Sequence, residues 1–512
     1  MKRTGIVITG LLILAVILIT VSNNFVTAAK KNPPVELKVE VFDRALPGYQ
    51  ADNNYWTKWI QKNFGTPNNI IMKFVSVVRL QEVERLNVLM ASNDAPDIVF
   101  TYDMPTVYNY VRYGGLTDLE EPLNKYGKNL KNYLGKEVLD LGVFNGVQYT
   151  IPAKRVLYGA INGFIRKDWL DKLGLPMPKT TQEWYYTMKA FKEKDPGGLG
   201  NQVIPYGMLT DPQNILWYCQ PLVDSFKGEM TDAEMKYLPE WLMPGVKDAM
   251  RFMNKMYNEG LISPEFALDR DQQKWFRDIQ QGRTGFFIGT VDQPYRINPG
   301  LSTELKKNVP GGELVPCDPF VNSRGKRLKR VYDQKGFYIM VPKSSKRVVE
   351  AIKYLDWMSQ PEVRDFLLNG EKGIHYKEYR DGIPVNILVD GEKRLTTDIC
   401  LIVNGKDFGD EEKNITAQAF TCPGYEKLFI ESYKMSITAD KKYFYPEFPI
   451  ESEAKLKNSL FEKGAEIFVK SLVVKPAEFD RTYDTLVEEY MKMGGRQVME
   501  DRKAYLKANR KK

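Results

Sequence analysis

The chain has 512 residues, which is too long for one ordinary hydrophobic core and indicates two or more compact units. Hydrophobic residues make up 43% and charged residues 27% of the sequence, so the composition is globular and argues against extended disorder. The net charge of +8 is mild for this length, and no basic stripe with interleaved aromatic residues occurs, which argues against a nucleic-acid partner.

The first 28 residues are predicted to be an export signal peptide. Two basic residues precede an uncharged, mostly apolar run over residues 5–21, and Val26 and Ala28 stand at the −3 and −1 positions of a cleavage site. The run is slightly short for a complete membrane span, which favours a cleaved signal over an uncut membrane anchor. We therefore expect an extracellular or cell-surface protein, with the uncut anchor as the alternative.

The four cysteines, Cys219, Cys317, Cys400 and Cys422, are widely spaced and form no CxxC pair, so a zinc site is not expected. In an exported chain they can pair as disulfides or remain buried thiols, and the sequence does not choose between these states. None of them follows the apolar run of the leader, so no lipid-anchored cysteine is expected there.

Strands and helices alternate in the first part of the chain after the leader. Period-two and apolar patterns predict strands over 35–42, 70–78 and 96–102. Helical spacing predicts helices over 53–64, 80–92 and 107–116, and the last of these ends at Gly114 and Gly115. This alternation indicates an α/β unit with a largely parallel sheet.

The remainder of the chain is more helical. Strands are predicted over 159–165, 284–289 and 335–342. Helices are predicted over 180–194, 238–260, 271–282, 345–359, 459–474 and 479–495. No repeat and no Pro/Ser-rich linker separates these segments, so two interwoven lobes are favoured over independent domains in series.

Several stretches resemble one protein family, the extracellular solute-binding proteins of ABC importers, in the large oligosaccharide-binding group of family 1. They are "NDAPDIVFTYDM", "YGGLTDLEEPLNKYG", "GFIRKDWLDKLGLPMPKT", "FRDIQQGRTGFFIG" and "FDRTYDTLVEEYMKMGGRQVMEDRKAYLKA". Their order and spacing cover nearly the whole chain after the leader. The resemblance implies a periplasmic-binding-protein-like α/β fold, in which two discontinuous lobes are joined by hinge strands and enclose a ligand cleft.

The resemblance also implies where the lobes exchange chain segments. Crossovers are expected near Pro152, Pro316 and Gly373. The first lobe then consists of residues 36–152 plus 316–372, and the second of residues 153–315 plus 373–512. The lobes would close over a bound ligand by a hinge motion.

The function implied by the resemblance is capture of an oligosaccharide for import, with membrane permease subunits as partners, no cofactor and a monomeric chain. No G-x-S-x-G, H-E-x-x-H or P-loop motif occurs, so an enzyme is not expected. Two alternatives stay open. A secreted glycosidase or lyase could find paired carboxylates among 65 Asp and Glu residues, and a peptide receptor could use the same scaffold.

Many members of the resembled family carry a calcium loop of the form "D-P-N-G-N-G-K-x-D-E-I-P" after the helix that corresponds to residues 180–194. Asp195 and Pro196 match this form, but Gly197 and Leu199 fall where oxygen ligands are needed. The loop is also one residue shorter. Because Ca²⁺ requires six to eight oxygen ligands, the sequence predicts no tight metal site here.

Proteins bind sugars through aromatic ring faces and planar polar groups, and loops at the carboxyl ends of strands are the expected place for both. The predicted ligand contacts are Tyr102, Asp103, Lys154, Arg155, Tyr158, Trp217, Tyr218, Trp275, Asp292 and Gln293. Structural alternatives remain for several of these: a helix cap for Asp103, a core position for Trp275, and the core for one of the adjacent Trp217 and Tyr218. The single histidine, His375, is expected to have a surface role.

Lys154 and Arg155 follow Pro152, where the chain is expected to enter the second lobe. A guanidinium can bind a carboxylate through two parallel hydrogen bonds, so this pair predicts an oligosaccharide that bears acidic groups. Adjacent residues on a strand point to opposite faces, however, so both serve only if the strand ends there. A neutral sugar, or two solvated surface charges, is the alternative.

Overall fold

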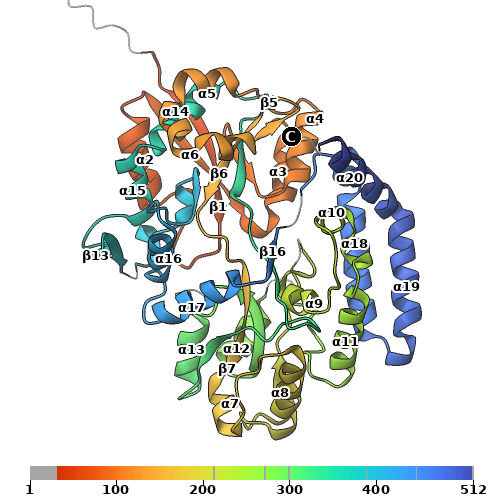
Figure 1. Cartoon of the computed structure of the whole chain (residues 1–512). Helices are drawn as coiled ribbons and strands as arrows, with labels where there is room; N and C mark the ends of the chain where they lie inside the picture. Colours follow the sequence, from red (N-terminus) through yellow and green to blue (C-terminus); the bar gives the residue numbers. More distant parts are fainter. Residues whose placement is uncertain are drawn as a thin grey trace, which may run out of the picture.

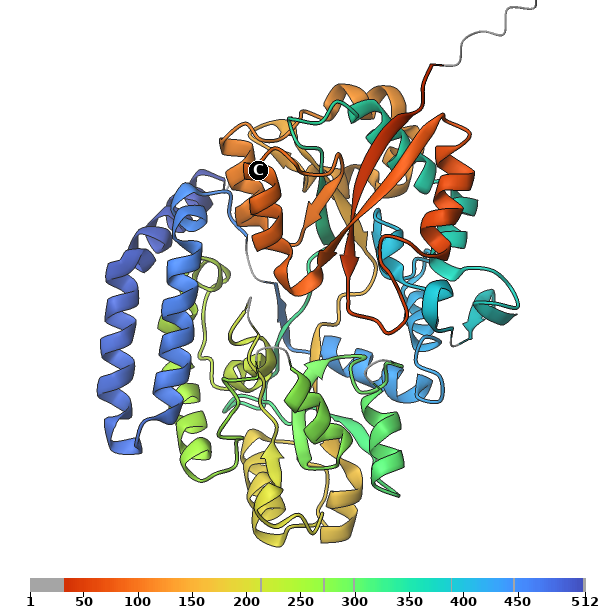
Figure 2. The same ribbon diagram turned by 180° about the vertical axis from the view of Figure 1, so that it is seen from behind.

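The computed structural model describes residues 32–211, 214–269, 272–297, 300–387, 389–444 and 447–509. The predicted signal peptide lies outside these residues. Across the described ranges, no helix combines the length and the apolar character that a membrane crossing requires. Figures 1 and 2 show an upper and a lower α/β lobe, with three long C-terminal helices along one edge of both.

The upper lobe is built on a twisted sheet. Strand β1 (Val35–Asp43) pairs in parallel with β2 (Ile70–Val78), and a bridge between Val39 and Ile98 places β3 (Val99–Thr101) along its other side. Strand β12 (Lys335–Met340) then runs antiparallel to both β3 and β6 (Thr150–Arg155), and β15 (Val403–Asn404) adds in parallel to β6. The surrounding helices are α2 (Tyr55–Ile60), α3 (Glu82–Ala91), α4 (Met104–Arg112), α5 (Glu120–Tyr126), α6 (Lys128–Asp140), α14 (Val348–Met358) and α15 (Pro361–Asn369).

The lower lobe has a second four-stranded sheet in the order β10-β7-β9-β8. Strands β10 (Leu314–Cys317) and β9 (Thr284–Thr290) flank β7 (Ile161–Arg166) in antiparallel pairing, and β8 (Ile204–Tyr206) pairs in parallel with β9. Its helices include α7 (Lys167–Leu173), α8 (Thr181–Lys194), α9 (Gln220–Asp224), α11 (Val246–Asn258), α12 (Gln273–Gln280), α13 (Leu301–Asn308) and α17 (Glu426–Ile437).

The prediction of a largely parallel sheet is therefore only partly correct. The β1, β2 and β3 strands are parallel, as the alternation of strands and helices indicated. Strands β6, β7, β10 and β12 lead into or out of the other lobe, so the chain returns through each sheet in the opposite direction. Antiparallel pairs at these positions follow from two lobes that share one chain.

The lobes are connected by several chain crossings that lie side by side (Figure 1). The segment after β6 and the segment before β12 meet in an antiparallel bridge between Gly159 and Val331, and the Tyr332 amide donates to the Tyr158 carbonyl at 2.9 Å. Next to them, β11 (Leu328–Arg330) pairs in parallel with β16 (Lys441–Tyr443). Paired backbone at the crossings gives the hinge a defined path.

Residues 399–403 lie in a different lobe from the one predicted. They were expected in the second lobe, but they pack in the hydrophobic core of the first, together with Leu37, Phe100 and Ile339. The reason is that β15 extends the upper sheet through its pairing with β6. The chain then goes back to the lower lobe, where Ile415 is buried with the helix α17.

Helix α18 (Glu451–Val473) contacts both lobes, and α19 (Phe479–Tyr490) and α20 (Arg496–Ala508) follow it along the right edge of Figure 1. Its second half is buried in the lower core, and the Asn254 amide of α11 donates to the Ser471 and Leu472 carbonyls at 3.0 Å each. Its first half faces α4, where Arg112 pairs with Glu451 at 2.6 Å. The interface is thus apolar toward one lobe and ionic toward the other.

The helix predicted over 238–260 is interrupted. A short 3-10 turn occupies Glu240–Leu242, and α11 begins only at Val246. Pro244 lacks an amide hydrogen, and Gly245 has φ of +86°, a conformation that continues no right-handed helix. A Cβ at Gly245 would lie 1.8 Å from the Phe226 carbonyl oxygen, so a close approach of backbone also requires glycine there.

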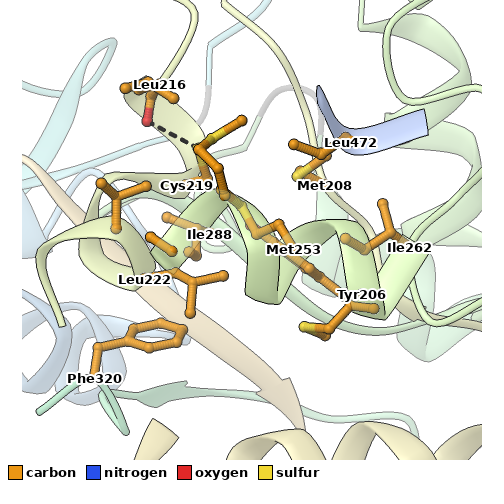
Figure 3. Packing of buried hydrophobic residues seen from close by; sticks show 14 of the residues in the cluster. Tyr206, Met208, Leu216, Cys219, Leu222, Met253, Ile262, Ile288, Phe320 and Leu472 are labelled. Carbon is orange, nitrogen blue, oxygen red and sulfur yellow. Dashed lines mark hydrogen bonds between the residues drawn. The ribbon is translucent and has the colours of Figure 1, made fainter. Parts of the chain in front are cut away.

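All four cysteines are buried free thiols. Figure 3 shows Cys219 in the lower core beside Leu216, Leu222 and Met253, where its thiol donates to the Leu216 carbonyl at 3.4 Å. Of the two states that the sequence left open, the structure therefore has the buried thiols.

Candidate functional site

A continuous row of half-buried polar and aromatic side chains connects the two lobes. We call it the junction cluster, and its members are Tyr102, Arg155, Trp217, Tyr332 and Asn404. The Asn404 amide nitrogen donates to the Tyr102 hydroxyl at 3.0 Å, and its carbonyl oxygen accepts from Arg155 Nη1 at 3.1 Å. The Arg155 guanidinium lies 4.1 Å from the centre of the Tyr332 ring, which packs 5.6 Å from the Trp217 ring.

On the upper side, Tyr102 directly follows β3, at the carboxyl end of a parallel strand. The rings of Phe42 and Phe337 support it at centroid distances of 6.3 and 5.3 Å, and the Arg79 guanidinium lies 4.6 Å over its ring. Burial raises the pKa of Tyr102, and the nearby Arg79 only partly opposes this. The phenol is therefore neutral, and it has a hydrogen to donate to a ligand.

In the middle of the row, Arg155 ends β6 and is fixed by three contacts. Besides Asn404 and Tyr332, its Nε donates to the Lys335 carbonyl at 3.0 Å. Lys154 points the opposite way, because neighbouring residues on a strand alternate. Its ammonium pairs with Asp407 at 2.8 Å, and the same carboxylate accepts the Tyr133 hydroxyl at 2.9 Å. The side chains of Lys154 and Arg155, both predicted as ligand contacts, thus lie on opposite faces of β6, and only Arg155 joins the junction cluster.

On the lower side, Trp217 begins a 3-10 turn (Trp217–Cys219) whose other residues are buried. Leu216 and Cys219 anchor this turn in the hydrophobic cluster of Figure 3. Tyr218 is only 7% exposed and lies in the core, whereas Trp217 remains half-buried with the Arg330 guanidinium 4.6 Å over its ring. A rigid core therefore holds one aromatic side chain at the junction.

Two arginine–aspartate pairs face the same region, one from each lobe. Arg44 binds both carboxylate oxygens of Asp398, with Nη2 at 2.8 Å from Oδ1. Arg296 binds Asp292 in the same manner, at 2.8 and 2.7 Å. Burial raises the pKa of Asp292, but the charge and hydrogen bonds of Arg296 outweigh it and hold that pKa below its usual value. The charge of Arg44 opposes the rise in the pKa of Arg296, so the two pairs lie near each other.

Three of the predicted ligand contacts are engaged in interactions within the protein. Trp275 is 5% exposed and its indole nitrogen donates to the Gly207 carbonyl at 2.8 Å, so no ring face is open to a sugar. Gln293 is 4% exposed and accepts the Thr290 amide at 3.1 Å. Asp103 caps α4 by accepting the Thr106 amide at 2.9 Å, and it also binds Lys457. We do not retain Trp275, Gln293 and Tyr218 among the proposed contacts, because burial removes their side chains from a ligand.

His375 was expected at the surface, and this expectation is wrong. The side chain is fully buried, with its Nδ1 accepting the Glu371 amide at 2.9 Å and its Nε2 2.8 Å from the Lys393 carbonyl. The ring packs against Trp56 at 4.7 Å. Burial lowers the pKa of His375, so the neutral ring serves as a structural hydrogen-bonding group.

The loop after α8 satisfies its acidic residue with its own backbone. The two carboxylate oxygens of Asp195 accept the amides of Leu199 at 2.8 Å and Gly200 at 2.7 Å. Asp195 itself has φ of +42°, and the Lys172 ammonium binds the Pro196 carbonyl. The Asp195 carboxylate and the Pro196 carbonyl of this turn thus accept hydrogen bonds from groups of the protein itself.

Several residues at the junction were not predicted from the sequence. Arg44 and Arg79 follow β1 and β2 as Tyr102 follows β3, so the same carboxyl-end rule identifies them when it is applied to every strand. Tyr332 and Asn404 lie on crossing segments, and only the tertiary pairing of those segments brings them to Arg155.

Residues 48–365 match the model of the family described as bacterial extracellular solute-binding protein. This match covers more than half of the chain, and the chain belongs to that family. Lipoprotein LipO of Bacillus subtilis (strain 168) is 26% identical over 437 residues, or 82% of each chain. The polygalacturonan/rhamnogalacturonan-binding protein YtcQ of the same organism is 24% identical over 436 residues, again 82% of each.

Solved structures confirm the predicted fold. The Streptococcus pneumoniae substrate-binding protein FusA in complex with kestose has a TM-score of 0.70 at 18% identity, covering 93% of this chain and 99% of that one. The alginate-binding protein AlgQ2 without calcium ion has a TM-score of 0.67 at 20% identity, covering 92% and 97%. The two α/β lobes of this chain thus have the periplasmic-binding-protein arrangement.

Proposed function

We propose that this protein is the extracellular substrate-binding component of an ABC importer and captures an oligosaccharide between its two lobes. The junction cluster carries this proposal. It places aromatic rings, Tyr102, Trp217 and Tyr332, beside planar polar groups on both sides of a hinge. Ring faces and fixed hydrogen-bonding groups are what a sugar needs, and closure of two lobes over it excludes water.

The relatives support both the proposed class of ligand and its import through an ABC transporter. Their names include binding proteins for polygalacturonan or rhamnogalacturonan and for fructooligosaccharides, and FusA is named as an ABC transporter substrate-binding protein. Permease subunits of such a transporter are the expected partners, with the chain acting as a monomer outside the membrane. We also propose that the chain passes between the lobes near Pro152 and Pro316, as predicted. The third predicted boundary, near Gly373, is not part of this proposal, because residues 399–403 pack in the first lobe.

Two aspartates at the junction favour binding over hydrolysis. A glycosidase requires a carboxyl group with a raised pKa as the general acid. At the junction, Asp292 has a lowered pKa under the influence of Arg296, and both oxygens of Asp398 are engaged by Arg44. These two carboxylates therefore support binding of hydroxyl groups rather than proton donation to a leaving group.

The first experiment is a thermal-shift and calorimetric screen of oligosaccharides and peptides. Binding to the folded state alone raises the unfolding temperature, so at least one oligosaccharide is expected to stabilise the protein. Substitution Trp217→Ala should weaken that saccharide at least about fivefold, the size of one lost aromatic stacking contact. Tyr186→Ala removes an exposed aromatic ring from α8 and serves as the control.

Three results would contradict the proposal. Stabilisation by peptides alone would favour the peptide receptor. Release of shortened sugar products by the wild type would establish a glycan-active enzyme. Equal loss of saccharide affinity in the Trp217 and Tyr186 variants would remove the junction cluster as the site.

A further inference from the structure

Most basic side chains around the junction cluster have a carboxylate partner. Arg79 lies 3.1 Å from Glu82, Lys154 lies 2.8 Å from Asp407, and Arg296 lies 2.7 Å from Asp292. Arg44 is held by both oxygens of Asp398. These pairs are locally neutral, so they offer hydrogen bonds to a ligand without attracting net charge.

Arg155 is different. Within the described residues, no carboxylate lies within 4.0 Å of its guanidinium, and its two side-chain hydrogen bonds go to neutral oxygens of Lys335 and Asn404. It is nevertheless half-buried against the Tyr332 ring. A partly desolvated guanidinium without a counter-ion is energetically costly, and a negatively charged ligand group would remove that cost.

The geometry of Arg155 also leaves donors available. A guanidinium has five N–H groups, and the bonds to Lys335 and Asn404 use one on Nε and one on Nη1. The second Nη1 hydrogen and both Nη2 hydrogens remain. The first contacts fix the plane of the group, so the remaining edge is preorganised for a planar acceptor with two oxygens.

We propose that Arg155 is a carboxylate-binding subsite and that the captured oligosaccharide contains a uronic acid residue. The sugar carboxylate binds the free edge of the Arg155 guanidinium while Tyr332 and Trp217 contact the ring faces of that residue or its neighbour. This inference rests on the proposed function. The junction cluster by itself could accept neutral or acidic oligosaccharides, and this inference selects the acidic ones. It assigns recognition of the carboxylate to Arg155 and not to Lys154.

The test uses one ligand in charged and neutral form. Tri- and tetragalacturonate are compared with their methyl esters, which keep the shape of the sugar but remove the carboxylate charge. The wild type should bind the acids at least about tenfold more tightly than the esters, as expected for a hydrogen-bonded charge pair. The preference should weaken as salt is raised.

Variants then assign the preference to one residue. Arg155→Gln should weaken acid binding by a much larger factor than ester binding and so abolish the difference between acid and ester, because the charged contact with the carboxylate is lost in addition to the contacts that Arg155 makes within the junction cluster. Arg155→Lys keeps the charge but loses the planar fork, so an intermediate preference is expected. Lys154→Gln, one residue away and paired with Asp407, should retain the full preference. Unfolding temperatures of all variants establish that each is folded.

The outcomes separate this inference from the proposed function. The uronate subsite is overturned if the wild type binds acids and esters equally. It is also overturned if the wild type binds only neutral fructo- or galacto-oligosaccharides. Both results leave the proposed saccharide capture intact. Equal weakening of acid and ester by Arg155→Gln also overturns it, since that result indicates a structural role. A sulfated oligosaccharide that binds more tightly than the acid assigns the edge to sulfate instead. Absence of binding to every saccharide overturns both proposals.

Discussion

Glu40 is a buried carboxyl group in the first strand, close to the carboxyl end of the upper sheet. Its Oε2 accepts the Phe100 amide at 3.2 Å, and its Oε1 has no hydrogen-bond partner among the described residues. Burial raises the pKa of Glu40 to about 8, the Phe100 amide partly opposes this, and the charge of Glu82 adds to it. The carboxyl group is therefore protonated at neutral pH.

This state makes the stability of the protein depend on pH. The pKa of Glu40 is raised in the folded state, so its contribution to stability is complete below about pH 4.5 and is lost as pH rises toward 8. Glu40→Gln should therefore become increasingly stabilising relative to the wild type over this range, by roughly 1.4 kcal/mol per pKa unit at most. Urea unfolding at pH 5 to 8.5 measures the difference.

Glu36→Gln is the matched control, because Glu36 is exposed on the same strand. Its effect on the free energy of unfolding should stay nearly constant over the same pH range. A Glu40→Gln effect that is equally flat would show that Glu40 is ionised in the folded protein.

At the scale of one element, the break before α11 predicts a sharp difference between two glycines. Gly245 and Gly174 both have positive φ, at +86° and +63°, so alanine at either position costs about 1–2 kcal/mol in backbone conformation. A Cβ at Gly174 meets nothing within 4 Å, whereas a Cβ at Gly245 meets the Phe226 carbonyl at 1.8 Å. Gly245→Ala should therefore lower the free energy of unfolding clearly more than Gly174→Ala, as measured by urea denaturation. Equal losses would mean that the segment before α11 moves without cost.

The elements also show which parts of the fold can be predicted from a sequence. The alternating pattern of residues 35–42 and the apolar run of 70–78 correctly predicted β1 and β2, because each pattern depends on local burial alone. The direction of β12 and β6 within the sheet depends on the crossings between lobes, and no local pattern encodes it. The helix over 238–260 was predicted without its break, since helical apolar spacing outweighed the Pro244–Gly245 signal.

The candidate site divides in the same way. Tyr102, Arg155 and Trp217 were found from their neighbours in sequence, namely the end of a strand, a crossover and an aromatic pair. Asn404 joins two of these residues by hydrogen bonds, yet it lies 249 positions from Arg155 along the chain. A single asparagine in a short strand carries no local signal, so only the folded chain reveals its role.

At the scale of the whole molecule, α18 indicates which contacts change when the lobes move. Its second half is buried with the lower core, while its first half meets α4 through Arg112–Glu451 and Asp103–Lys457. Ion pairs that solvent partly reaches are weak, so closure should alter this interface and leave the buried half unchanged. With a saturating saccharide, hydrogen–deuterium exchange should change over residues 451–458 and stay constant over 467–472. A uniform change along α18 would contradict this division.

The buried thiols have a practical consequence for the study of that motion. Burial raises the pKa of each of the four cysteines, and none of them is exposed, so the native chain should react slowly with maleimide reagents. A pair of cysteines introduced at exposed positions, one per lobe, such as Val88 and Leu268, would then carry fluorescent dyes without removal of any native residue. Energy transfer between the dyes would report the distance between lobes in single molecules, before and after sugar is added.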